Sequence, residues 1–417
     1  MNPDSKSVFD YIFGLTVPGV KLELSRVEDF MDRLGKPHTS YPIIHIAGTN
    51  GKGSTAAMLA AILNAYRKKT GLFTSPHLVR PNERIRVGNT LVSDEFIVQQ
   101  VEDWRAHIDD LGITFFEVLT ALGMEYFKQQ SVEYAVIETG LGGRLDATNV
   151  VDPIVSVITN VSMDHENILG DNLTTIAGEK AGIIKPKRPT LLGKNSDVVR
   201  QVIEQKCQHV KAPFINVPDR VKIQQVVPQG LSQHVSIGVA DKTLEIDLPL
   251  LGRHQVENFT NVLATLDELG FKLDAATIQK GLDEMIWLGR MQVLEKNHPV
   301  MYDVAHNPEG LDRLLESLNE LDRGNTIIVA AFNARKNIRP MLDMLENWTG
   351  NVIFTIFAGH SAVERETLMH LGVNSDMISS NLENAYIRAL ELRSSEDQAI
   401  CFIGSHYLAE TLFPMFE

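Results

Sequence analysis

A glycine-rich stretch at residues 42–55, with the sequence PIIHIAGTNGKGST, carries the strongest chemical signal in the chain. Its glycines let backbone amides approach phosphate oxygens, and a helix that starts here adds the partial positive charge of its N-terminus. Lys52 adds a full positive charge, and the hydroxyl of Ser54 or Thr55 suits a magnesium ion that accompanies a nucleotide. The spacing is a variant of the common P-loop, and the alternative is a plain glycine turn. We interpret residues 48–55 as a nucleotide-binding loop, called the phosphate loop below: Gly48, Thr49, Asn50, Gly51, Lys52, Gly53, Ser54 and Thr55.

Acidic and imidazole side chains follow two further strand-like runs. Glu138 ends the run at residues 134–138. Asp164 and His165 come a few residues beyond the run at 155–159. Ligands gather at the carboxyl ends of strands in open α/β sheets, so we expect Glu138 and His165 to converge on the phosphate loop. These two side chains suit magnesium or manganese, although a His beside an Asp is more often a surface or structural pair.

The elements that must position these groups follow the pattern of a parallel sheet covered by helices on both faces. Short β-branched runs alternate with helix-like segments, whereas residues 212–250 form short alternating runs that predict a small antiparallel excursion. After a linker at 287–290, the alternation restarts. The predicted strands are 43–46, 134–138, 155–159, 300–303, 326–331, 352–356 and 399–403, and the predicted helices are 54–68, 116–129, 175–182, 254–269 and 275–285.

Composition limits the class of protein. The chain has 417 residues and a formal net charge of -14, so two or three domains are expected, and the negative surface disfavours nucleic acid and anionic membranes as partners. Its two cysteines, Cys207 and Cys401, indicate neither a disulfide framework nor a structural zinc site. Neither a signal peptide nor a membrane-spanning run is evident. We therefore expect a cytoplasmic protein, and we expect it to be a monomer.

Six ordered segments resemble the motifs of the folylpolyglutamate synthases, which are relatives of the Mur ligases. The resemblance spans residues 11–408, nearly the whole chain. It implies an α/β protein with two domains. Residues 1–288 would form a P-loop ATPase-like domain with the antiparallel excursion, and residues 289–417 a smaller, Rossmann-like glutamate-ligase domain. The segments are GTNGKGST at 48–55, FTSPHL at 73–78 with ERI at 83–85, ETGLGGRLDATN at 138–149, DH at 164–165 with EKAGIIK at 179–185, GRHQ at 252–255 with Asn258, and GR at 289–290 with DVAHNP at 303–308.

The resemblance also implies a metal and catalytic set in the first domain. One magnesium ion would be held by Ser75, Glu138 and His165, and a second would lie near Ser54 and the nucleotide phosphates. Lys180 matches a lysine that carbon dioxide carbamylates, which would convert it into a carboxylate able to bind or orient the second metal. The residues alone leave open an ordinary solvated lysine facing the helix dipole.

Further roles follow from the same resemblance. Asn258 would lie near the adenine of ATP, Arg290 and Asp303 would contact ATP, and His306 and Ser405 would serve the incoming glutamate, with His306 also acting on the acyl phosphate. Phe116, Asp146 and Ala147 match a dihydropteroate pocket. Each assignment has an alternative without a role in binding. Phe116 could be a core residue and Asp146 a loop carboxylate, while Arg290 could be a salt-bridge partner and residues 306–308 an ordinary capped helix start. The chain departs from the family pattern at Leu288, Val304 and Asn333.

The expected reaction is phosphoryl transfer from ATP to a folate or dihydropteroate carboxylate, followed by attack of the L-glutamate amine on the acyl phosphate. Magnesium and Lys52 would neutralise the developing charge. Two alternatives remain at this stage. A Mur-type cell-wall ligase would prefer a UDP-sugar acid, and a nucleotide-binding regulator would have kept the fold without turnover.

Overall fold

The computed structural model describes residues 3–15, 23–295, 299–321, 323–334, 337–357 and 362–417. The chain divides into two compact units. The first contains residues 1–224, 236–246 and 257–286, and the second contains residues 225–235, 247–256 and 287–417. Among the described residues, no helix has the length and apolar character needed to cross a membrane.

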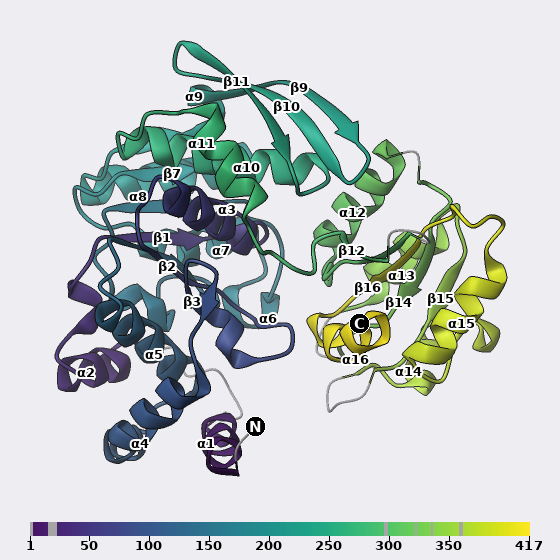
Figure 1. The fold of residues 1–417 in the computed structure, drawn as a ribbon, viewed down its shortest axis with the longest axis horizontal. Helices are drawn as coiled ribbons and strands as arrows, with labels where there is room; N and C mark the ends of the chain where they lie inside the picture. Colours follow the sequence, from purple (N-terminus) through teal and green to yellow (C-terminus); the bar gives the residue numbers. More distant parts are fainter. Residues whose placement is uncertain (1–2, 16–22, 296–298, 322, 335–336, 358–361) are drawn as a thin grey trace. The chain divides into compact units, whose positions relative to one another are not determined.

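The first unit, which includes β1, β2, β3 and β7 in Figure 1, is built around an eight-stranded sheet. Its strand order is β4-β3-β2-β5-β1-β6-β7-β8. The central strand β1 (Ile43–Ala47) is buried along its whole length. It pairs in parallel with β5 (Tyr134–Glu138) on one side and β6 (Val155–Ile158) on the other. These three predicted strands are therefore neighbours, as expected. The strands β2 (Thr70–Phe73), β7 (Thr190–Leu192) and β8 (Phe214–Asn216) run parallel to them. At the β2 edge, β3 (Ile85–Val87) pairs antiparallel with β2, and β4 (Thr90–Leu91) pairs antiparallel with β3.

Helices cover both faces of this sheet. On one face, α3 (Lys52–Ala65) contacts β1, β2 and β5, and α11 (Ala275–Asp283) packs on it so closely that a Cβ at Gly281 would overlap the backbone of Ile62. On the opposite face, α5 (Phe115–Gln129) packs on β2 and β3. The other helices of this unit are α1 (Pro3–Gly14), α2 (Ser25–Arg33) and α4 (Asp94–Leu111) around α5, and α6 (Glu166–Leu169), α7 (Leu173–Lys180), α8 (Asp197–Val210) and α9 (Val217–Arg220). Residues 257–268 of α10 (Arg253–Glu268) also belong to this unit.

The expected excursion is a separate three-stranded sheet of β9 (Val221–Gln229), β10 (Ser232–Val239) and β11 (Lys242–Leu248). Consecutive strands are joined by two residues each, which is the length of a tight hairpin and makes the sheet antiparallel. The predicted start at residue 212 was early, because residues 214–216 form β8 of the large sheet.

The second unit has a five-stranded sheet in the order β12-β13-β16-β14-β15. The four predicted strands form β13 (Val300–Tyr302), β14 (Ile327–Ala330), β15 (Val352–Phe354) and β16 (Ile400–Ile403), all parallel. The unpredicted β12 (Gln292–Glu295) adds an antiparallel edge. The fold class expected from the sequence is thus confirmed. The helices are α12 (Pro308–Glu320), α13 (Arg339–Glu346), α14 (Arg365–His370), α15 (Leu382–Leu392) and α16 (Ala409–Phe416).

Candidate active site

The phosphate loop connects the carboxyl end of β1 to the N-terminus of α3. Gly51 has a φ of 84°, a left-handed conformation that favours glycine. A Cβ at this position would also overlap the side-chain amide of Asn258 on α10. A Cβ at Gly48 would overlap the hydroxyl of Thr159. Two glycines of the motif are therefore required by local geometry, and Asn258 lies against the loop.

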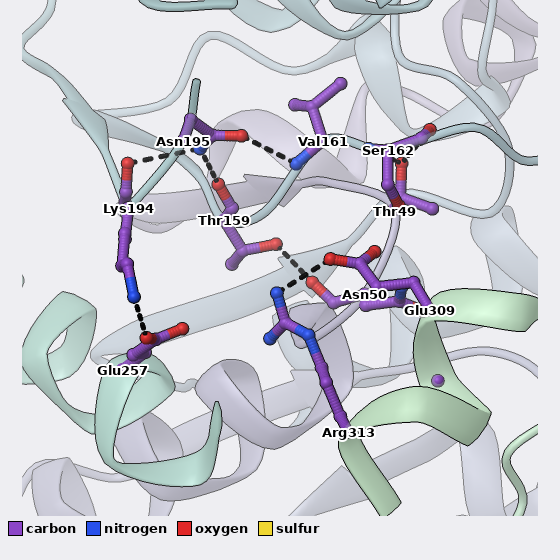
Figure 2. A network of polar contacts seen from close by, with 12 residues as sticks. Thr49, Asn50, Thr159, Val161, Ser162, Lys194, Asn195, Glu257, Glu309 and Arg313 are labelled. Carbon is purple, nitrogen blue, oxygen red and sulfur yellow. Dashed lines mark hydrogen bonds and ion pairs between the residues drawn. The ribbon is translucent and has the colours of Figure 1, made fainter. Parts of the chain in front are cut away.

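The loop that follows β6, residues 159–162, holds the phosphate loop by hydrogen bonds (Figure 2). The Thr49 amide donates to Asn160 O at 2.6 Å, and the Thr159 hydroxyl donates to Asn50 O at 2.8 Å. Thr49 Oγ1 also donates to Ser162 O at 3.1 Å and accepts from Ser162 N at 3.0 Å. The phosphate loop is thus fixed at two successive residues by this neighbouring segment, which we call the β6 loop.

Lys52, Glu138 and Ser75 come together at the carboxyl edge of the sheet. Lys52 Nζ donates to Thr49 O at 3.2 Å and lies 4.0 Å from Glu138 Oε1. The other carboxylate oxygen of Glu138 accepts from Ser75 N at 2.9 Å. Glu138 is only 3% exposed, so its charge is poorly screened by solvent and interacts strongly with a nearby cation. The cluster combines a cation and a buried carboxylate beside the phosphate loop.

Ser54 and Thr55 lie in the first turn of α3 and are both buried. Thr55 Oγ1 has no hydrogen-bond partner within the described part of the chain. A buried hydroxyl without a partner costs free energy that a ligand or water could recover. The start of α3 thus carries two buried hydroxyl groups directly after Lys52.

Lys180, at the end of α7, is 3% exposed, and its Nζ donates to Gly48 O at 2.8 Å. Burial, with a contribution from the nearby charge of Lys52, lowers the pKa of its amine to about 7, although Asp164 and Asp146 oppose this shift. Near neutral pH a substantial fraction of such an amine is uncharged. The ordinary solvated lysine that the sequence left open does not describe this residue.

Two signature segments pack against each other to place Lys180. A Cβ at Gly143 would approach the carbonyl oxygens of Glu179 and Lys180 to 2.9 and 3.0 Å, and one at Gly182 would overlap Arg144. Arg144 in turn pairs with Glu179 at 2.9 Å. The small residues of both motifs are therefore needed for close backbone packing beside the site.

Asp146 is buried in its own loop, where Oδ2 accepts from Leu141 N at 2.7 Å and Oδ1 from Thr148 N at 3.0 Å. Burial raises the pKa of its carboxyl, although these hydrogen bonds oppose the shift. Thr148 Oγ1 donates to Asp146 Oδ1 at 2.6 Å and lies 2.8 Å from His45 Nε2. Burial lowers the pKa of His45 to about 3, so this imidazole is neutral. Sequence reasoning missed His45, although a polar residue inside an apolar strand was a signal.

The other two predicted pocket residues lie near this network. Phe116 packs against Gly140, where a Cβ would meet its ring at 2.5 Å, and its ring centroid lies 6.0 Å from that of Phe73. Ala147 begins the short helical turn after Asp146 and is buried. The structure thus brings Phe116 and the Asp146 loop to the carboxyl end of β5. These contacts are also those of a core phenylalanine and of a carboxylate that orders its own loop, which are the alternatives to a substrate pocket.

His165 is less enclosed than Glu138. Its side chain is 42% exposed, its Nε2 lies 3.9 Å from Asp164 Oδ2, and its φ of 52° is left-handed. Across the described ranges, no three His, Cys, Asp or Glu side chains gather as a metal site. The metal role of His165 stays a prediction.

The predicted residues of the second unit lie near the ends of β13 and β16. Asp303 is buried and accepts from Met291 N and Ala305 N, each at 2.8 Å. Burial raises the pKa of its carboxyl, and the charge of Arg290 opposes this. His306 Nδ1 lies 2.8 Å from Val304 O, so Nδ1 donates to that carbonyl.

Several further residues surround these groups. The rings of His306 and His406 are 5.0 Å apart, and the buried Ser405 accepts from Tyr407 N at 3.2 Å. Asn307 caps α12 by accepting from Gly310 N at 2.7 Å, as the capped-helix alternative requires. Of the departures from the family pattern, Leu288 is exposed, Val304 is buried and Asn333 forms a bridge with Ala362.

Comparisons with known proteins agree with this architecture. Residues 46–266 match the Mur ligase middle domain, and residues 289–406 match the Mur ligase glutamate ligase domain. The dihydrofolate synthase/folylpolyglutamate synthase of Bacillus subtilis is 33% identical and covers 95% of each chain. The folylpolyglutamate synthase of Lacticaseibacillus casei is 31% identical over 93% of this chain and 92% of its own.

A solved structure is similarly close. The Mycobacterium tuberculosis folylpolyglutamate synthase complexed with ADP has a TM-score of 0.90, is 29% identical, and aligns over 99% of this chain and 98% of its own. The match therefore extends through both units. This chain belongs to the dihydrofolate synthase/folylpolyglutamate synthase family of Mur ligases.

Proposed function

We propose that this protein is an ATP-dependent ligase that joins L-glutamate to a folate-type acid. The observation that carries the proposal is the convergence of Lys52, Glu138 and the buried Lys180 on one phosphate loop, in a chain whose relatives bear these enzyme names over nearly their full length. Neither the cell-wall ligase nor the inactive regulator considered above is favoured by a specific feature of the site.

The reaction follows in two steps. A carboxylate oxygen of the folate attacks the γ-phosphorus of ATP, and the bond between this phosphorus and the oxygen that bridges to the β-phosphate breaks. ADP departs, and the folate carboxylate has become an acyl phosphate. The glutamate amine then attacks the acyl carbon, phosphate departs, and the amine loses a proton as the amide forms. Lys52, held over the loop by Thr49 O, supplies positive charge where negative charge develops. The relative solved with ADP supports nucleotide binding at this loop.

We propose that magnesium binds at two sites beside the phosphate loop. Oxygen ligands suit this hard cation, and the buried Glu138, which accepts from Ser75 N, supplies a carboxylate near Lys52 of the phosphate loop. We propose Ser54 and Ser75 as further oxygen ligands and His165 as a nitrogen ligand. Bound magnesium would neutralise charge on the phosphates.

Lys180 is proposed to carry a carbamate. Its amine is buried and next to the phosphate loop, and its lowered pKa leaves a neutral nucleophile near pH 7. The amine attacks carbon dioxide and loses one proton, which replaces a cation with a carboxylate. Mass spectrometry under gentle, bicarbonate-containing conditions should show the carbamate, and Lys180→Ala should lose activity. An active alanine variant would contradict this assignment.

The acid substrate can be tested directly. Dihydropteroate and tetrahydrofolate should be supplied separately as glutamate acceptors, with ADP release as the readout. Glutamate-dependent ADP release with tetrahydrofolate is expected, and release with dihydropteroate would add the dihydrofolate synthase activity that the Bacillus subtilis relative's name includes. No glutamate-dependent release with either acid would refute the proposed function.

The remaining assignments stay predictions. They comprise ATP contacts by Asn258, Arg290 and Asp303, glutamate handling by His306 and Ser405, and the pocket of Phe116, Asp146 and Ala147. The domain limits at residues 288 and 289, the monomeric state and the cytoplasmic location also stay predictions.

A further inference from the structure

The side chain of Asn195 lies in the loop after β7 and makes three hydrogen bonds (Figure 2). Its Nδ2 donates to Thr159 O at 2.6 Å and to Gly193 O at 3.1 Å, and its Oδ1 accepts from Val161 N at 2.8 Å. Both amide hydrogens and the carbonyl oxygen are therefore used. This one side chain ties the β6 loop to the end of the neighbouring strand.

The β6 loop is the segment that holds the phosphate loop. The hydroxyl of the fully buried Thr159 donates to Asn50 O at 2.8 Å, and Gly48 approaches that hydroxyl so closely that a Cβ would overlap it. Asn160 O accepts from Thr49 N at 2.6 Å. A shift of the β6 backbone must therefore move the phosphate loop.

We propose that Asn195 is a positioning residue for the nucleotide. It fixes the β6 loop on either side of Asn160, and the β6 loop fixes the backbone of the phosphate loop. This inference rests on the proposed function, because it requires the phosphate loop to bind ATP or ADP. Phosphate recognition by backbone amides depends on their preset directions, so a loosened loop binds more weakly.

Asn195 is suited to act on binding rather than on overall folding. It is partly exposed and polar, and it therefore contributes little buried apolar surface. Its partners are backbone groups of loops rather than core side chains. Its removal should loosen the local backbone at modest cost to the stability of the unit.

The first test is ADP binding to the full-length Asn195→Ala variant by isothermal titration calorimetry. We expect the dissociation constant to rise about tenfold, since three hydrogen bonds that order the loop are lost. The KM for the folate acceptor should change by less than about twofold, because the side chain acts on the nucleotide side. Equal ADP affinity of variant and wild type, or equal losses for both ligands, would overturn the inference.

Asn381→Ala is the matched control. Asn381 is the N-cap of α15 in the second unit and accepts from Asn384 N at 2.8 Å. The substitution removes an identical side chain and a local side-chain hydrogen bond without touching the phosphate loop. Its ADP affinity should match the wild type. A comparable loss in this control would attribute the effect to general destabilisation and overturn the inference.

If Asn195→Ala folds poorly, a second pair of variants tests the contact between the β6 loop and the phosphate loop. Thr159→Val keeps the volume and removes the donor to Asn50 O, whereas Thr159→Ser keeps the hydroxyl. The serine variant should bind ADP more tightly than the valine variant. Equal binding by both would overturn the inference. Failure of the wild type to bind ADP would instead refute the proposed function, so the two failures are distinguishable.

Discussion

The buried His45 predicts a specific dependence of stability on pH. It is fully buried on the central strand, and burial lowers the pKa of its imidazole to about 3 from an ordinary value of 6.5. In the unfolded chain the imidazole gains a proton as the pH falls below 6.5, whereas in the folded protein it stays neutral down to about 3. Between about pH 6.5 and pH 3 the unfolded state therefore binds more protons than the folded state, so the free energy of unfolding decreases as the pH is lowered.

The magnitude follows from the two pKa values. Roughly a tenth of the unfolded imidazoles are protonated at about pH 7.5, and roughly nine tenths at about pH 5.5. Integrating proton uptake gives a loss of about 1.4 kcal/mol from His45 over this interval. His45→Gln keeps a side-chain amide donor for Thr148 and cannot be protonated. The variant should therefore lose about 1.4 kcal/mol less than the wild type.

Urea denaturation of both proteins at the two pH values measures this double difference, in which the contributions of all other groups cancel. His209→Gln, at an exposed position of α8, is the control. This variant should lose the same free energy of unfolding between the two pH values as the wild type. If His45→Gln and the wild type lose the same free energy, His45 is protonated in the fold and the reasoning about its environment is wrong.

Three further predictions concern the two units. Gly51→Ala should weaken ADP binding at least about tenfold in calorimetry, because φ is left-handed and the new Cβ would overlap Asn258; unchanged affinity would show that the loop adapts. Glu138→Gln should raise the magnesium concentration for half-maximal activity about tenfold, and an unaltered requirement would exclude this carboxylate as a ligand. Asp303→Asn should lower the free energy of unfolding in urea by about 1–3 kcal/mol, since an amide cannot accept from both Met291 N and Ala305 N; an unchanged transition would count against the buried acceptor role.

The sequence predicted the elements whose signals are local and contiguous. The phosphate loop could be recognised because its glycines, lysine and hydroxyls stand together between an apolar run and a helix. Strands such as β1 and β5 were evident as apolar runs. The strands β2, β7 and β8 were not predicted; each is a short run that contains a single β-branched residue.

The environment of the site was not predictable, because it depends on contacts between distant segments. Nothing local distinguishes Lys180 from a solvated lysine, yet its side chain is buried and its Nζ donates to Gly48 O, which is 132 residues away in the sequence. Asn195 similarly reads as an ordinary loop residue. Only the proximity of β6 and β7 in space reveals that its amide ties two loops together.

The strand order has a consequence for synthesis on the ribosome. Translation delivers β1 and the glycine-rich motif early, but both strands that flank β1 are encoded much later in the message. A nascent chain halted before β6 would contain every residue of the motif and none of the threonine and asparagine groups that hold it. The hydrogen bonds that fix Thr49 and Asn50 can therefore form only late in elongation, after residues 159–162 have left the exit tunnel.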